Sequence, residues 1–376
     1  MNFNDIPGHA DAKDRLRALV STAHVPHALL LSGPPGSGKM LLARTFAQYL
    51  HCEHPTDGNP CGKCNACRMH AENSHPDLHF VYPIVKSEKQ KRTVSADVAE
   101  QWHEMLSTYP AMPVEKWHEL LGAGNSQPVI YVNEADRIVE ADALPAYSST
   151  RKIFIIWQPE RLRPEAANKL LKVIEEPSDT TLFIMVSNDP LKILPTIASR
   201  LQNIHIGRLS DSDIAGYLQQ TKGLSDNDAW RLAPLAHGSL IESDELCRRS
   251  GEPLEFLQMY QESMRAAYSK RVGMLKSLAE NAAAWGREKL CRYLTYSARM
   301  IRENFIYNMK VARLRTMTPD EEAFSQRFSP FINHANVEDF SEETDMARRD
   351  IERNGNAKLV MFDYFIHCIM LLHRKA

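Results

Sequence analysis

The stretch LLLSGPPGSGK, residues 29–39, decides the fold. It joins a run of apolar residues to a glycine-rich loop that ends in lysine, and a helical pattern begins at Met40. A buried strand that feeds such a loop points successive backbone N–H groups at one spot, beside the positive end of the next helix dipole. This arrangement binds phosphate, so we expect a nucleotide site formed by Gly33, Pro34, Pro35, Gly36, Ser37, Gly38, Lys39 and Met40.

The loop departs from the usual phosphate-binding pattern at its last position. That pattern has Ser or Thr after the lysine, to place a hydroxyl on Mg²⁺, whereas this chain has Met40. A thioether has little affinity for a hard cation. Two interpretations stay open: a loop that holds ATP or ADP without a complete magnesium site, and a Gly/Pro turn without a ligand.

The composition is that of an ordinary soluble protein. The 376 residues are 43% apolar and 24% charged, which is enough chain for two or three domains. The net charge of −2 predicts no long-range attraction to DNA, so any nucleic-acid contact must be local or shared with partners. No apolar run approaches the roughly 18 residues that span a membrane. Because residues 1–16 also lack the apolar segment of a signal peptide, we expect a cytoplasmic protein without membrane contact.

Four of the seven cysteines lie close together in the sequence. Their x8, x2, x2 spacing includes two overlapping C-x-x-C turns, which suits a tetrahedral Zn²⁺ site. A site with four thiolates is closed, so the zinc would be structural and would hold together a small protrusion. An iron–sulfur cluster and a disulfide pair remain alternatives. The candidate ligands are Cys52, Cys61, Cys64 and Cys67.

Strand and helix patterns alternate through the first half of the chain. Apolar strand patterns lie at 28–32, 75–85, 128–131, 152–157, 181–188 and 203–206, with helical patterns between them. This alternation predicts a parallel sheet covered by helices on both faces. Residues 86–126 are interpreted as an insertion, and their basic run KSEKQKR at 86–92 as a solvated surface rather than a phosphate contact.

The strand at 152–157 ends without the acidic residues of a phosphate-loop ATPase. Such strands end in carboxylates that bind Mg²⁺ and polarise the attacking water. Trp157 and Gln158 stand there instead, and we expect Glu160, further on, to face elsewhere. The sequence therefore predicts that this chain does not hydrolyse ATP.

Taken together, these motifs resemble the clamp-loader branch of the AAA+ superfamily, which includes subunits of bacterial DNA polymerase III. The resemblance covers residues 5–245 and is only a helical character beyond them. It implies an AAA+ core at 1–206, a helical lid at 207–248 and a helical collar for oligomerisation at 249–376, although a turn-rich acidic stretch is expected at 316–350. The matching segments are PHALLLSGPPGSGK at 26–39, the four-cysteine module at 52–67, NKLLKVIEEP at 168–177 and ASR at 198–200.

The resemblance also assigns a role to Arg200. In this family a Ser-Arg-Cys motif offers an arginine in trans to ATP bound on the neighbouring subunit. Ser199 and Arg200 match the motif, and Leu201 replaces its cysteine. A guanidinium can neutralise the charge that builds up on a transferred phosphoryl group. Without the resemblance, Arg200 would be interpreted as the cap of a short helix in a surface ion pair.

The departures from the family pattern indicate a non-hydrolysing member. The motor subunits, gamma and tau, keep the hydroxyl, the acidic strand end and a lid arginine, whose place in HGSLIES is taken by Ile241. The resemblance implies a stator-like part of a DNA-directed DNA polymerase holoenzyme. Its partners would be the gamma/tau ATPase and delta subunits in a hetero-pentamer, the sliding clamp, and primed DNA through the complex. The alternatives are an active AAA+ ATPase that uses Glu160 or Glu175, and a nucleotide-binding regulatory adaptor outside replication.

Overall fold

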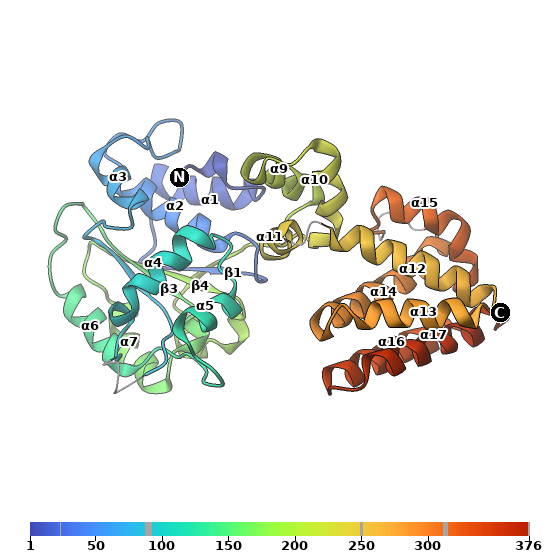
Figure 1. Cartoon of the computed structure of the whole chain (residues 1–376). Helices are drawn as coiled ribbons and strands as arrows, with labels where there is room; N and C mark the ends of the chain where they lie inside the picture. The colour runs from blue at the N-terminus through green and yellow to red at the C-terminus, as the bar shows by residue number, and fades with distance from the viewer. Residues whose placement is uncertain (23, 87–91, 249–250, 311–314, 375–376) are drawn as a thin grey trace. The chain divides into compact units, whose positions relative to one another are not determined.

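The computed structural model describes residues 1–22, 24–86, 92–248, 251–310 and 315–374 (Figure 1). Two compact units are present, Met1–Ala229 with Ala236–Asp244, and Trp230–Leu235 with Glu245–Ala376. Most of the basic run at 86–92, including Lys89 and Lys91, lies outside the described residues.

The first unit is built on a parallel five-stranded sheet, as the sequence predicts. Its order is β2-β3-β4-β1-β5. Residues 128–131 do not form the expected strand, because Val129 and Ile130 make only isolated bridges to Ile84 and Leu162. The strands are β1 (Ala28–Ser32), β2 (Leu78–Val81), β3 (Lys152–Trp157), β4 (Thr181–Ser187) and β5 (Gln202–His205).

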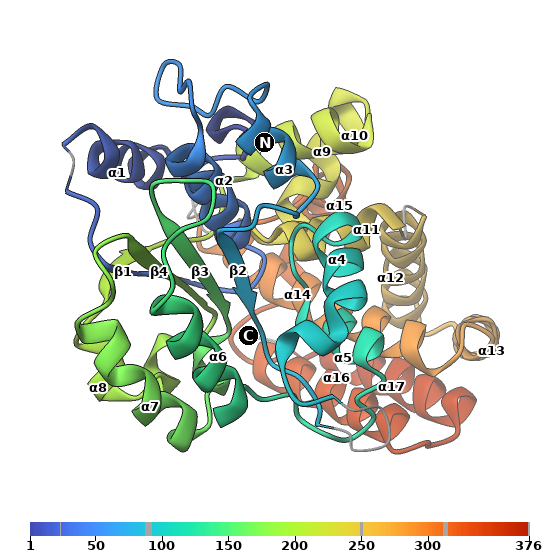
Figure 2. The ribbon, with the colours of Figure 1, turned by 90° about the vertical axis from the view of Figure 1, so that its left-hand side faces the viewer.

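Helices cover both faces of this sheet (Figure 2). Alternate strand side chains such as Leu30 and Phe154 join one apolar core with residues of α6 (Val132–Asp142), α7 (Pro164–Glu175) and α8 (Pro195–Ala198). The intervening side chains point to the opposite face, because successive residues of a strand alternate. There α2 (Lys39–His51), which is buried along almost its whole length, packs against β3 and β4.

The described part of residues 1–248 contains the following further elements. The α-helices are α1 (Ala10–Ser21), α3 (Asn65–Ala71), α4 (Ala99–Thr108), α5 (Val114–Leu121), α9 (Asp211–Lys222), α10 (Asp226–Leu232) and α11 (Leu240–Arg248). The short 3₁₀ turns are η1 (Phe3–Asp5), η2 (Ser95–Val98), η3 (Pro159–Arg161), η4 (Pro190–Lys192) and η5 (Ala233–Ala236).

An aromatic cluster holds the inserted helices α4 and α5 to the sheet. The ring of Trp102 on α4 stacks on Tyr82 at 3.9 Å, and its centroid lies 5.5 Å from that of Trp157 at the end of β3. Trp117 on α5 lies 6.2 Å from Trp157 and donates a hydrogen bond from Nε1 to the Pro83 carbonyl. The side chain of Trp157 is therefore used to anchor the insertion.

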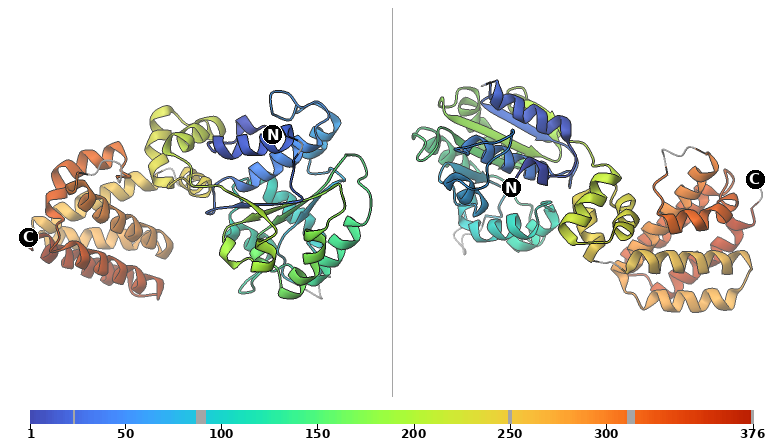
Figure 3. Two further views of the ribbon diagram at one scale, coloured as in Figure 1. Left: turned by 180° about the vertical axis from the view of Figure 1, so that it is seen from behind. Right: turned by 90° about the horizontal axis from the view of Figure 1, so that it is seen from above.

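The second unit is helical throughout its described part (Figure 3). Its core is one apolar cluster that includes Tyr260, Tyr293 and Phe365. The expected turn-rich stretch at 316–350 is wrong, because two helices occupy most of it. No described helix is both long enough and apolar enough to cross a membrane. The elements are α12 (Glu252–Tyr268), α13 (Val272–Ala283), α14 (Arg287–Asn308), α15 (Pro319–Phe328), η7 (Ser329–Phe331), α16 (Val337–Glu352) and α17 (Ala357–Leu372).

Candidate functional site

The glycine-rich loop joins the end of β1 to the start of α2, and two of its glycines are required by close contacts. A Cβ atom on Gly33 would lie 1.9 Å from the Ile206 carbonyl oxygen. On Gly36, whose φ is +75°, it would lie 2.1 Å from Ser239 Oγ. Only glycine fits either position. The loop therefore has the backbone of a phosphate-binding turn at the N-terminus of a buried helix.

Lys39 fills the inside of this loop. Its Nζ donates hydrogen bonds to the carbonyl oxygens of Gly33 at 2.8 Å and Pro34 at 2.6 Å, and to Ser37 Oγ at 3.2 Å. Burial lowers the pKa of Lys39 to about 8, although the negative charge of Glu160 opposes the shift. These carbonyls are neutral acceptors, and a bound phosphate would supply the negative charge that pairs with the ammonium group. Lys39 is therefore placed to hold a phosphate.

Residues of the lid segment close over the loop. The backbone N–H of Leu240 donates to the Gly36 carbonyl at 2.8 Å. The Ile241 backbone nitrogen lies 3.1 Å from the place that a Cβ atom on Gly36 would occupy. The residue at the lid-arginine position therefore does lie beside the loop. Because Ile241 carries no charge, it offers phosphate no counter-ion.

The end of β3 carries no carboxylate, and Glu160 in the following turn is the next one along the chain. Trp157 is buried, and Gln158 takes a left-handed conformation with φ of +56°. Beyond that bend, Glu160 accepts a hydrogen bond from the Asn188 backbone N–H at 3.1 Å, while its Oε2 is buried and has no hydrogen-bond partner among the described residues. The charge of Glu160 also raises the pKa of Lys39 against the effect of burial, and that its side chain faces away from the phosphates stays a prediction. Met40 is buried as well, and its thioether offers no ligand to a hard cation.

Arg200 follows the short helix α8 and is anchored at two points. Its Nη1 donates to the Thr196 carbonyl at 2.6 Å, and its Nη2 forms an ion pair with Glu175 Oε1 at 2.7 Å. About 29% of the Arg200 side chain is exposed, and its Nε is buried with no partner in the part of the chain that the structure describes. These contacts match the cap-and-ion-pair interpretation. Nη1 also donates a long hydrogen bond to Ser199 Oγ at 3.5 Å, so one of the four Nη hydrogens, on Nη2, is left for another acceptor.

The sheet places Arg200 far from the phosphate loop of its own chain. In the parallel pair of β1 and β5, Leu29 lies opposite Gln202 and Ser32 opposite His205. Gly33 follows one end of this pair and Arg200 precedes the other, and the four paired residues span about 13 Å. In Figure 2, α2 and α8 lie toward opposite ends of the strands. Arg200 and the phosphate loop of the same chain therefore lie at opposite ends of the β1–β5 pair.

The four predicted cysteine ligands converge. Their sulfur atoms all lie within 4.8 Å of one another, and all seven cysteines are free thiols, which excludes the disulfide alternative. Cys61 Sγ and Cys67 Sγ are 4.0 Å apart, close to the roughly 3.8 Å between sulfurs of a tetrahedral zinc site. Backbone N–H groups of Lys63 and Cys64 donate to Cys61 Sγ and lower its pKa to about 6, which favours the thiolate that binds metal. The donor set therefore fits Zn²⁺.

A second group of potential ligands, His51, His70 and His75, lies buried nearby. His51 Nε2 lies 2.9 Å from the Arg151 carbonyl oxygen and therefore carries the proton, which leaves Nδ1 to accept from His70 Nε2 at 2.8 Å. His75 Nδ1 accepts from the Asp77 backbone N–H at 3.2 Å. Burial lowers the pKa of His51 to about 4 and that of His70 to about 2. The three rings are thus neutral and hydrogen-bonded to one another or to backbone groups.

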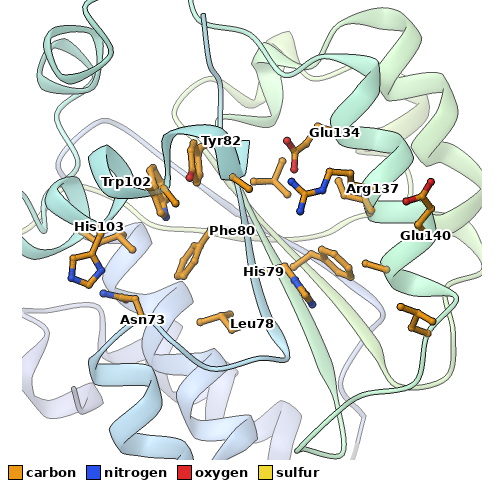
Figure 4. Close-up of a pocket in the computed structure, with 18 residues that line it drawn as sticks. Asn73, Leu78, His79, Phe80, Tyr82, Trp102, His103, Glu134, Arg137 and Glu140 are labelled. Carbon is orange, nitrogen blue, oxygen red and sulfur yellow. The ribbon is translucent and has the colours of Figure 1, made fainter. Parts of the chain in front are cut away.

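A cavity of about 550 Å³ lies beside β2, between α4 and α6 (Figure 4). Tyr82 stacks there on Trp102, and His79 stacks on Phe154 at 4.8 Å. The buried carboxylate of Glu134 accepts a hydrogen bond from the Ser95 backbone N–H. These side chains pack and hydrogen-bond within the edge of the sheet and are committed to that role. The loop at 33–40 therefore remains the candidate nucleotide site.

Residues 8–210 match the model of the family described as "DNA polymerase III, delta subunit". The match covers more than half of the chain and includes the phosphate loop, the cysteine module and Arg200. The chain belongs to this family. Its departures at Met40, Trp157 and Gln158 therefore lie inside the segment that defines the family.

Curated relatives agree with this assignment. The DNA polymerase III subunit delta' of Pseudomonas aeruginosa is 32% identical over 174 residues, which cover 46% of this chain and 41% of the relative. That of Escherichia coli is 28% identical over 187 residues, or 50% of this chain and 44% of the relative. The subunit tau of Bacillus subtilis is 27% identical and is covered over 31% of its length. The chain thus spans less than half the length of these relatives.

Solved structures match at lower identity. A DNA polymerase III gamma subunit-related protein from Thermotoga maritima is 13% identical with a TM-score of 0.38, over 96% of this chain and 100% of that chain. The RuvB Holliday junction branch migration motor of the same organism is 14% identical with a TM-score of 0.37, over 67% of this chain and 64% of that chain.

Proposed function

We propose that this chain is a non-hydrolysing, stator-like delta' subunit of the DNA polymerase III clamp loader. It would join gamma/tau ATPase and delta subunits in a hetero-pentamer that loads a sliding clamp on primed DNA, with residues 249–376 as its collar and 207–248 as its lid. The observation that carries the proposal is Trp157, which occupies the place of the catalytic carboxylates and is committed to the aromatic cluster of the insertion. Relatives named delta' support the choice of subunit.

In this role the chain's own loop holds a nucleotide but does not cleave it. Residues 33–40 would bind the phosphates of ATP or ADP through backbone N–H groups and Lys39. Met40 and Ile241 leave the site without a magnesium hydroxyl ligand and without a lid cation. Zinc at the four cysteines would hold residues 52–67 in shape.

Arg200 would act on the neighbouring subunit as an arginine finger. Its position at the opposite end of the sheet from its own loop supports action in trans. A guanidinium beside the transferred phosphoryl group neutralises the charge that develops there. Rings reconstituted with Arg200→Ala should assemble normally but hydrolyse ATP and load the clamp more slowly. Full ATPase activity in that ring would rule out the finger.

A second candidate function, an active ATPase, is favoured by one observation. One oxygen of the Glu160 carboxylate is buried without a hydrogen-bond partner among the described residues, and its charge raises the pKa of Lys39, as expected of a displaced catalytic acid. Turnover of Mg·ATP by the purified chain separates the two candidates. The stator predicts a background rate that Glu160→Gln leaves unchanged, whereas brisk hydrolysis abolished by Glu160→Gln would establish the ATPase.

A further inference from the structure

We infer that Glu175 is a positioning residue that orients Arg200 for the neighbouring subunit. The inference rests on the proposed function, since it concerns the arginine assigned there as the finger. It starts from the ion pair between Glu175 Oε1 and Arg200 Nη2, which are 2.7 Å apart. Glu175 is the last residue of α7, whereas Arg200 follows α8, so the pair joins two separate helix ends.

The guanidinium is fixed by two acceptors on different sides. The Thr196 carbonyl accepts from Nη1 at 2.6 Å and Glu175 accepts from Nη2 at 2.7 Å. A planar group held at both nitrogens has a defined plane, which a single contact would not impose. Nη1 also donates a long hydrogen bond to Ser199 Oγ at 3.5 Å, and one hydrogen remains on Nη2 for an outside acceptor. A phosphoryl oxygen can take this free hydrogen while both anchors stay in place.

Thr196 alone cannot set this orientation. It lies on the same short helical turn as Arg200 and would accept from several rotamers of a long, flexible side chain. Glu175 comes from α7, which packs against the sheet through its buried residues Ala167, Leu170 and Ile174. The ion pair with Glu175 therefore fixes the position of the Arg200 guanidinium relative to the rigid core of the unit. Geometry of this kind affects the rate of a reaction more than the affinity for its substrate.

The ion pair also accounts for an acid at the C-terminal end of a helix. The negative end of the helix dipole disfavours a carboxylate there, and Glu175 has Glu176 beside it. Arg200 supplies the opposite charge for Glu175, while Glu176 is exposed and has no hydrogen-bond partner for its side chain within the described residues. Glu176 is therefore a matched control: a neighbouring exposed carboxylate at the same helix end.

The test is single-turnover ATP hydrolysis by reconstituted rings. The kinetic phase that Arg200→Ala removes identifies the site that Arg200 serves. Glu175→Gln should slow this phase about two- to fivefold without changing the nucleotide affinity of the ring, the range expected from a partly exposed ion pair. Glu175→Asp should recover part of the rate, and Glu176→Gln should leave it at the wild-type value.

A double variant excludes a merely structural role. If Glu175 acts through Arg200, then Glu175→Gln has no further effect on the ATPase of Arg200→Ala rings. Additive losses, or a wild-type rate with Glu175→Gln, would overturn the inference while leaving the finger intact. A wild-type rate with Arg200→Ala would instead overturn the proposed function itself.

Discussion

Replacing Trp157 by alanine tests whether the end of β3 has become structural. The side chain is 2% exposed and packs between Trp102 and Trp117 of the insertion, with centroids at 5.5 and 6.2 Å. A buried tryptophan removes about 200 Å² from water, worth about 5 kcal/mol at 25 cal/mol per Å². Measured Trp→Ala changes in cores cost about 3–5 kcal/mol, so both routes give the same range.

The assay is urea unfolding of the full chain, followed by circular dichroism and by tryptophan fluorescence. The variant should lower the free energy of unfolding of the unit that contains the sheet by about 3–5 kcal/mol, which appears as a lower urea midpoint of its transition. Trp230→Ala is the control, because Trp230 is 44% exposed and should cost less than about 1 kcal/mol. Equal shifts for the two variants would refute the reasoning that Trp157 is the anchor of the insertion.

Two further predictions concern the metal and the loop. The proposed zinc site predicts one zinc ion per purified chain by elemental analysis. Cys64→Ser should remove this ion, whereas Cys291→Ser, at a half-buried cysteine outside the module, should retain it, and full zinc in Cys64→Ser would refute the assignment. Burial lowers the pKa of Lys39 to about 8, below its unfolded value of about 10.5. The folded chain therefore loses this proton as the pH rises through about 8, whereas the unfolded chain keeps it up to about 10.5. The contribution of Lys39 to the free energy of unfolding consequently rises between these two pH values. ADP requires the charged form, so its affinity should fall about tenfold between pH 7 and pH 9 by calorimetry. Lys39→Ala should bind weakly at both values, and an unchanged affinity for the native chain would contradict the assignment.

Much of the sheet could be predicted because its strands are local patterns. The apolar runs at 28–32, 152–157 and 181–187 form continuous buried strands, as parallel strands covered on both faces do. The loop and the cysteine module are short motifs whose residues meet through local turns. Their positions therefore follow from spacing alone.

The helices of residues 316–350 were missed because their composition is acidic and their apolar positions are few. The buried face of α16 consists of Phe340, Thr344, Ala347 and Ile351, at helical spacing but with a polar member. A signal for α15 was present in the capping box of Thr318 and Glu321.

Long-range placements could not be predicted. Glu160 follows a left-handed bend at Gln158 and accepts a hydrogen bond from the Asn188 backbone N–H, which a propensity for strand or turn does not reveal. His75 joins His51 and His70 from a loop after α3, through contacts that the spacing does not encode. The pairing of Arg200 with Glu175 likewise depends on how α7 and α8 meet.

The most direct test compares reconstituted rings that each carry one of two variants of this chain. The reason is that the chain is proposed to assist hydrolysis of ATP bound to another subunit and not of nucleotide in its own loop. Lys39→Ala disables the chain's own loop, and Arg200→Ala removes the group offered to the neighbour. The account predicts that rings with Lys39→Ala hydrolyse ATP at the wild-type rate, whereas rings with Arg200→Ala lose the phase of the neighbouring site. The reverse pattern, with hydrolysis dependent on Lys39 and indifferent to Arg200, would contradict it.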